Sequence, residues 1–216
     1  MKRQWFISGA LLTGGSVLAQ RVIDITGTGQ GKISINLGSF KTGSDAASRN
    51  FLAVLKADLN RSGYFSVSSS GGAVNVLGQA AGGSQIKADV HVYKAANRQK
   101  LMGKAYSPVS SGLYRKLAHA VADDIVYAVT GKKGMASGRI AVVGNRTGRK
   151  ELYVCDMDGK GMRQITKDRS IVVGPRWTPD GKNLIYTSYK RGYPNVYLTG
   201  RRDPITRYGG LNASGS

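Results

Sequence analysis

The sequence predicts an α+β two-layer N-terminal domain followed by an incomplete all-β propeller. Residues 33–134 follow the order strand, helix, several strands, helix, which is typical of two-layer α+β domains. Residues 135–216 instead repeat a unit of about 40 residues that is made of short strands. The 30 glycines among 216 residues suit a protein with many tight turns and argue against a helical bundle.

The first half of the α+β domain is predicted from alternation and capping. Ile33, Ile35 and Leu37 alternate as in a strand. Ser44 and Asp45 offer N-cap side chains for a helix that Gly63 ends. The apolar residues of this helix recur every three or four positions, at Ala47, Phe51, Val54 or Leu55, and Leu59. This periodicity predicts one buried helical face.

Further strands and a second helix complete this domain. Extended patterns are expected at 64–67, 74–77, 86–92 and 101–106. A helix is expected after Pro108 and Ser110/Ser111, with Gly131 just beyond its last turn. Its apolar positions are Leu113, Leu117, Val121, Ile125 and Val129.

After Gly134 the sequence contains two copies of one unit. The first has strands at 139–143, 151–156 and 163–166. Leu184–Thr187 matches the first of these, Val196–Leu198 matches Leu152–Val154 at an offset of 44, and Ile205-Thr206 matches Ile165-Thr166 at an offset of 40. Repeats of this length and strand content are typical of propeller blades.

A turn motif separates the two copies. A strand ends at Trp177, whose ring can fill the gap between blades. Pro179 presets the turn, Asp180 can accept hydrogen bonds from its backbone, and Gly181 can take the positive φ that reverses the chain. These four residues are predicted to be structural.

The propeller is expected to be incomplete. No innermost strand precedes the first copy, because residues 131–137 only lead out of a helix. The sequence stops one residue before the next expected aromatic–x-Pro-Asp-Gly motif, so we expect a C-terminally truncated fragment. Two blades cannot close a ring.

The first 19 residues have the features of a secretory signal peptide. Lys2 and Arg3 precede an uncharged, mostly apolar stretch from Trp5 to Leu18, and cleavage is expected after Ala19. The stretch is shorter than the roughly 20 residues of a spanning helix. We therefore expect an exported protein that does not span the membrane.

Residues 20–32 form a separate segment. Arg21, Val22, Ile23, Asp24, Ile25 and Thr26 are β-prone as a run, and Gly27, Gly29 and Gly31 follow them. Such a segment can add its backbone to the edge of another sheet, and its glycine linker leaves it mobile. The predicted boundaries are therefore 1–19, 20–32, 33–134 and 135–216.

The net charge of +20 raises the question of nucleic-acid binding. Residues 20–134 and residues 135–216 each carry 15 basic and 6 acidic residues, so the excess is dispersed and not gathered in one stripe. We expect no nucleic-acid partner, and only weak attraction to anionic envelope surfaces.

The single cysteine and the two histidines do not indicate a catalytic or metal site. Cys155, the only cysteine, lies in a predicted strand and is expected to be a buried small hydrophobe. His91 and His119 have no carboxylate or second histidine at ligand spacing, so solvated surface positions are favoured over a metal or catalytic pair. We expect no enzyme activity, cofactor or metal.

Four features in this order resemble the TolB family, the periplasmic propeller proteins of the Tol–Pal system. They are the signal, the segment Arg21–Gly27, the helix and hinge from Leu117–Ile125 to Thr130–Gly134, and the turn Trp177–Lys182. The turn motif occurs across propeller families, whereas the combination is specific. The resemblance implies a six-bladed ring, of which about two blades are present here.

The resemblance also implies two protein partners. A Pal-like peptidoglycan-associated lipoprotein would bind the propeller, and the C-terminal domain of TolA would take Arg21–Thr26. The protein would act as a periplasmic adaptor, a monomer in its full-length form, that maintains outer-membrane integrity and aids envelope constriction in cell division. The linker would let the segment detach or dock, the alternatives being a permanently disordered or permanently docked terminus.

Two other functions remain open from the residues alone. A propeller peptidase of the prolyl-oligopeptidase type, cut before its hydrolase domain, would need a Gly-x-Ser-x-Gly elbow that these 216 residues lack. A sugar-binding or lyase propeller would need acidic and aromatic residues along the channel.

Overall fold

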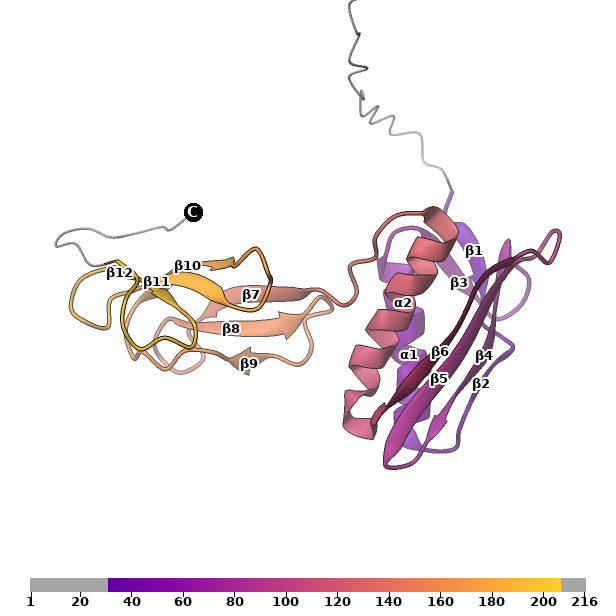
Figure 1. The fold of residues 1–216 in the computed structure, drawn as a ribbon, viewed down its shortest axis with the longest axis horizontal. Coiled ribbons are helices and arrows are strands. Elements are labelled where there is room, and N and C mark those ends of the chain that lie inside the picture. Colours follow the sequence, from indigo (N-terminus) through magenta and orange to yellow (C-terminus); the bar gives the residue numbers. More distant parts are fainter. Residues whose placement is uncertain (1–30, 207–216) are drawn as a thin grey trace, which may run out of the picture. The chain divides into compact units, whose positions relative to one another are not determined.

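The computed structural model of the chain describes residues 31–206 (Figure 1). The predicted signal peptide, its cleavage site and the segment Arg21–Thr26 lie outside the described residues. Within residues 31–206 there is one mixed sheet of six strands and there are two sheets of three strands. No helix among them is long and apolar enough to cross a membrane.

The six-stranded sheet belongs to the α+β domain and has the order β3-β1-β4-β5-β6, with β2 paired to β4. β1 pairs in parallel with β3 and β4, whereas β4, β5 and β6 form an antiparallel meander. The strands are β1 (Ile33–Asn36), β2 (Phe40–Thr42), β3 (Phe65–Ser68), β4 (Val74–Gly82), β5 (Gln85–Lys94) and β6 (Lys100–Ser110).

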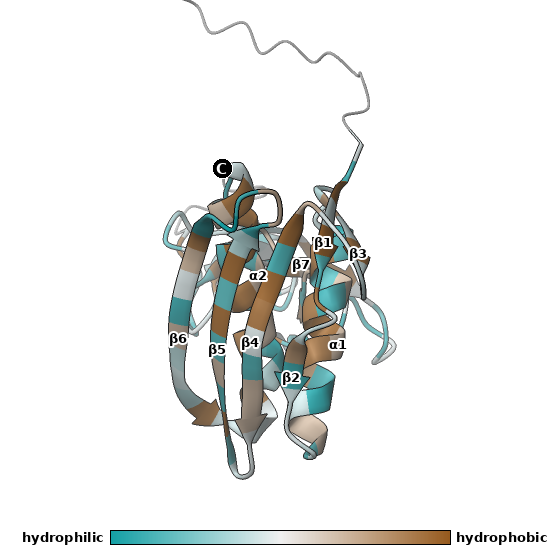
Figure 2. Cartoon of the chain, turned by 90° about the vertical axis from the view of Figure 1, so that its right-hand side faces the viewer, coloured by the Kyte–Doolittle hydropathy of each residue, from teal (hydrophilic) through white to brown (hydrophobic). Residues whose placement is uncertain are grey.

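Two helices, α1 (Ala46–Arg61) and α2 (Tyr114–Thr130), cover one face of this sheet (Figure 2). The Asp45 carboxylate accepts a hydrogen bond from the amide of Ser48 at 2.9 Å, which confirms the predicted N-cap of α1. Gly131 follows α2 with φ of 70°, the left-handed conformation expected beyond a helix. The predicted helices therefore exist with these ends.

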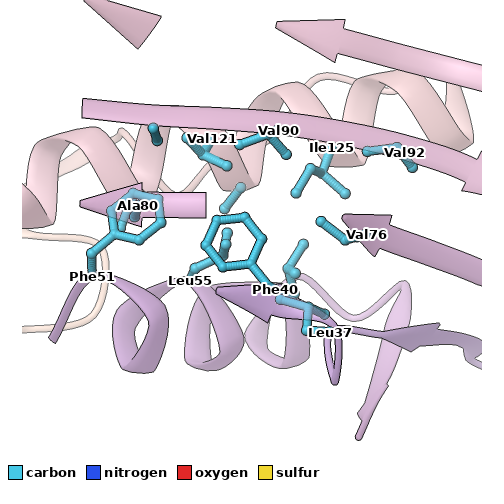
Figure 3. Close-up of a cluster of buried hydrophobic side chains, with 14 of the residues drawn as sticks. Leu37, Phe40, Phe51, Leu55, Val76, Ala80, Val90, Val92, Val121 and Ile125 are labelled. Carbon is cyan, nitrogen blue, oxygen red and sulfur yellow. The ribbon is translucent and has the colours of Figure 1, made fainter. Parts of the chain in front are cut away.

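The core lies between the helices and the sheet (Figure 3). Alternate residues of β5 are buried, as their sequence pattern predicts. Those side chains meet apolar side chains from both helices, including Phe51, Leu55, Val121 and Ile125. Leu113 is an exception, since it lies in a short 3₁₀ turn before α2 and is 42% exposed.

The last strand of this sheet runs further than its pattern predicts. The sequence predicts an end at Tyr106, but β6 continues through Pro108 to Ser110. β6 is an edge strand, and its register with β5 shifts between the pairs Ile86–Val109 and Ala88–Tyr106. Proline lacks an N–H and cannot donate to a neighbouring strand, so a sheet tolerates it at an irregularity on an edge strand.

The two three-stranded sheets are successive copies of one unit. The first has the order β7-β8-β9 and the second has the order β10-β11-β12. Each has its strands antiparallel. The strands are β7 (Arg139–Gly144), β8 (Glu151–Asp156), β9 (Arg163–Gln164), β10 (Val172–Trp177), β11 (Leu184–Ser188) and β12 (Asn195–Leu198).

Equivalent hydrogen bonds confirm the repeat. The amide of Ile165 donates to the oxygen of Leu152 at 2.8 Å, and the amide of Ile205 donates to the oxygen of Val196 at the same distance. Thr166 and Thr206 accept from the amides of Leu152 and Val196 through their hydroxyls. Residues 165–166 and 205–206 make these bonds without forming regular strand, so the strand predicted at 163–166 ends at Gln164 and its counterpart at 205–206 does not form.

The sheets form a partial propeller that does not close. A shared apolar cluster joins them, containing Leu152 and Val154 of the first sheet and Leu184, Tyr186 and Tyr197 of the second. Within residues 31–206, β7 pairs with β8 alone, so no innermost strand precedes it in its sheet. This agrees with the incomplete propeller predicted from the sequence.

Candidate functional site

A charged network links the two helices of the α+β domain to the first blade. Arg115 and His119 lie one turn apart on α2, and Asp58 lies on α1. Asp156 ends β8, and Asp158 lies in the turn that follows. The sequence distances of more than 40 residues between the helices and the blade explain why no local pattern reveals this network.

The geometry of the network is tight. His119 Nδ1 lies 2.5 Å from Asp58 Oδ2, and both side chains are almost fully buried. Arg115 donates to Asp158 at 2.6 Å and to Asp156 at 3.3 Å. The second ring nitrogen of His119 lies 3.6 Å from Asp156. Arg61 of α1 also bonds Asp58 at 2.8 Å, so one histidine and two arginines face three carboxylates.

The electrostatics favour a charged histidine. Burial alone lowers the pKa of His119, but the hydrogen bond and charge of Asp58, with the charge of Asp156, more than offset this and raise the pKa above its usual value. Arg115 opposes the increase. For Asp158, burial raises the pKa, and the hydrogen bonds from Arg115 and the Lys160 amide reverse this, so the pKa is lowered.

The prediction of a solvated surface position is wrong for His119. His119 is 3% exposed, and its carboxylate partner, Asp58, lies 61 positions away in the sequence. Spacing along a single helix or strand therefore could not reveal this pair. His91 fits the prediction better, since its side chain is one-third exposed and lies 3.3 Å from Asp89. Cys155 is buried at 5% exposure, as predicted.

The network has ligand types that a metal ion could use. The candidate ligand atoms of His119, Asp156 and Asp158 lie within 4.8 Å of one another. However, the Arg115 guanidinium already bonds both carboxylates and supplies the positive charge. A structural link between domain and blade therefore fits this arrangement better than a metal site.

The predicted turn motif lies between β10 and β11. Trp177 ends β10, and the amide of Gly181, at φ of 66°, donates to the oxygen of Thr178 at 2.8 Å. Asp180 accepts from the Thr178 hydroxyl and the Lys182 amide, and these bonds lower its pKa. Pro179 lies inside this turn.

One contact of the turn comes from the other blade. Arg139 of β7 stacks over the Trp177 ring, with its guanidinium carbon 4.6 Å from the ring centre. The same side chain donates to the oxygen of Gly181 at 2.7 Å. The motif therefore helps to hold the two blades together.

Comparisons with known proteins match both parts of the chain. Residues 21–117 match the model of the TolB amino-terminal domain, and residues 126–216 match that of the TolB beta propeller domain. Together they define the class, an N-terminal α+β domain joined to a β-propeller. The chain belongs to the TolB family.

Proteins similar to this chain are named TolB. The Tol-Pal system protein TolB of Bordetella pertussis is 32% identical over 95% of this chain and 52% of its own length. That of Hahella chejuensis is 32% identical over 99% of this chain and 57% of its own. The crystal structure of TolB from Acinetobacter baumannii, 27% identical, has a TM-score of 0.70 over 84% of this chain and 51% of that chain. The chain thus spans about half the length of the curated relatives it matches.

Proposed function

We propose that the chain acts as an exported, periplasmic adaptor of the Tol–Pal system and works by binding other proteins, without catalysis or cofactor. The observation that carries the proposal is the match of both domains, in order, to the TolB family. Relatives named Tol-Pal system proteins support the same role. This family match favours the adaptor over the propeller peptidase.

The first proposed partner is the C-terminal domain of TolA, bound by Arg21–Thr26. The segment alternates apolar side chains at Ile23 and Ile25, and a strand that adds to a sheet edge uses its backbone for affinity and alternate side chains for specificity. The chain is anchored just after the glycine linker, where the amide of Ile33 donates to the oxygen of Tyr64 at 2.8 Å. A fixed anchor and a glycine-rich linker suit a segment that docks and detaches.

The second proposed partner is a Pal-like lipoprotein, bound at the propeller. Through both partners the full-length protein, a monomer, would help to maintain outer-membrane integrity and envelope constriction during division. Cleavage after Ala19 would release the mature form.

Calorimetric titration of the mature chain tests the proposal. We expect binding to the TolA C-terminal domain, and loss of that binding in the variant Ile23→Asp/Ile25→Asp, because charged side chains cannot occupy apolar pockets. The linker variant Thr28→Ser/Gln30→Asn is the matched control and should bind as before. The Pal-like lipoprotein is titrated separately, and a folded sample that binds neither partner removes the proposal.

A further inference from the structure

Three loops gather at one end of the two blades. Gly144 of β7 pairs with Glu151 of β8, so the loop 145–150 closes that end of the first sheet. The chain leaving β9 returns to the same end, where the amides of Asp168 and Arg169 donate to the Glu151 carboxylate at 3.1 and 2.7 Å. The loop after β11 adjoins them, since the amide of Tyr189 donates to the oxygen of Ile171 at 3.0 Å.

These loops carry unpaired positive charge. Five exposed bases lie on two of them, and within residues 31–206 none makes an ion pair or a side-chain hydrogen bond. They are Arg146, Arg149, Lys150, Lys167 and Arg169. We call this surface the basic loop face.

The acidic groups at the basic loop face are already engaged. Glu151 is 2% exposed, and it accepts from the Thr166 hydroxyl and from two loop amides. Asp168 lies 3.5 Å from the ammonium of Lys190. Neither carboxylate pairs with any of the five bases, so the face keeps a net positive field beside the single negative charge of Glu151.

The face is hollowed between the first two loops. A hollow of about 620 Å³ is lined by Arg149, Lys167 and Arg169 together with Thr147, Gln164 and Glu151. Two guanidinium forks and one ammonium at the rim are groups that bind phosphate oxygens well. The hollow can therefore receive a phosphate-bearing group.

Two large apolar side chains stand exposed on the adjoining loops. Ile171 is 49% exposed and Tyr193 is 52% exposed. Bases next to an exposed tyrosine and an aliphatic side chain are the combination found where proteins lie on the headgroup region of membranes. A free anion would use neither apolar side chain, and one phosphate could not occupy five bases.

We propose that the basic loop face binds the phosphate groups of an anionic phospholipid surface. The five bases would contact headgroups, and Ile171 and Tyr193 would enter the interface between them. The proposal goes beyond the adaptor function, since it assigns a lipid contact to a surface of the first blades. It adds a second attachment to the envelope that needs no protein partner.

Sedimentation with lipid vesicles tests the proposal on the full mature chain. Binding is measured to phosphatidylcholine vesicles with and without phosphatidylglycerol. Each base near an anionic membrane strengthens binding roughly fivefold, so Arg149→Gln/Lys167→Gln/Arg169→Gln should weaken it roughly 100-fold. Tyr193→Ser should weaken it further, with circular dichroism confirming that each variant is folded.

A matched variant separates this face from the general positive charge. Lys41→Gln/Lys87→Gln/Lys100→Gln removes the same charge from exposed positions on the sheet of the α+β domain. This variant should weaken vesicle binding by less than about tenfold, compared with roughly 100-fold for the first triple variant. The reason is that charges farther than a Debye length from the membrane are screened.

Four results would overturn the proposal. They are an equal loss in both triple variants, equal binding to vesicles without phosphatidylglycerol, full competition by millimolar inorganic phosphate at constant ionic strength, and tight binding of a glutamate-rich peptide without vesicle binding. The third would identify free phosphate as the ligand, and the fourth an acidic protein. The proposal is supported if the control variant retains vesicle binding while Arg149→Gln/Lys167→Gln/Arg169→Gln loses most of it.

Discussion

The buried pair of His119 and Asp58 is the most informative position to perturb. His119→Phe fills similar space but removes both the charge and the hydrogen-bond donor that lies 2.5 Å from Asp58. The Asp58 carboxylate, 2% exposed, would then lose its buried cationic partner. The variant therefore tests whether this pair holds α1 against α2.

The expected cost follows from the remaining contacts of Asp58. Removing one partner of a buried ion pair destabilises a protein by about 3–5 kcal/mol, because the other charge stays buried. Here Arg61, itself half-exposed, still bonds Asp58 at 2.8 Å and offsets part of this cost. We therefore expect a loss of about 3 kcal/mol in the free energy of unfolding.

The cost should depend on pH with a definite sign. The folded pKa of His119 is raised above its unfolded value, so the folded state binds the proton more tightly. The stabilisation is then fully present below about pH 6.5 and is lost as pH rises through the folded pKa. The difference between wild type and variant should be larger near about pH 6 than near about pH 9.

Urea unfolding followed by helical circular dichroism measures both effects. The control is His91→Phe, at the one-third exposed histidine, which should cost less than about 1 kcal/mol. A cost below about 0.5 kcal/mol for His119→Phe, or an equal cost at both pH values, would refute the reasoning.

Three further predictions concern the blades and turns. Arg115→Gln removes the bonds to Asp156 and Asp158, so amide exchange in the turn 157–160 should accelerate about tenfold, and unchanged exchange would contradict the link. Glu151→Gln replaces one acceptor oxygen with an NH2 donor that faces a backbone N–H, so it should cost about 2 kcal/mol in urea unfolding, whereas a cost near zero would show that the carboxylate does not hold the loop. Gly181→Ala strains only a positive φ of 66° in open space and should cost about 1 kcal/mol by thermal unfolding. The comparison variant Gly38→Ala would press its Cβ against the backbone oxygen of Ser69 and should cost more than Gly181→Ala, so equal costs would show that crowding at Gly38 is relieved.

Local patterns predict most of the fold. The N-cap at Asp45, the left-handed Gly131 and the alternation along β5 depend on neighbours in sequence, so the amino-acid order alone is enough to predict them. The repeat match between Ile165 and Ile205 is confirmed, since the two residues make equivalent backbone hydrogen bonds. The blades can be predicted from the repeat because each copy has to bury the same apolar strand faces against its neighbours.

Contacts between distant elements escape such patterns. Asp58, His119 and Asp156 are brought together only by the packing of α1, α2 and β8, so no local pattern pairs them. The extension of β6 past Pro108 is hidden for a different reason, since only the edge position and the register shift make proline acceptable there. The five bases of the basic loop face likewise come from two loops that β8 and β9 separate in the sequence, so no single stretch of the chain shows them together.

Partner binding by the N-terminal segment is the functional proposal on which the adaptor role depends. Heteronuclear NMR of the labelled mature chain, titrated with the TolA C-terminal domain, tests it residue by residue. We expect large shift changes for the amides of Arg21–Thr26 and small ones across residues 33–206. Shifts spread over the sheet of the α+β domain with none in the segment, or no shifts at saturating partner, would contradict it.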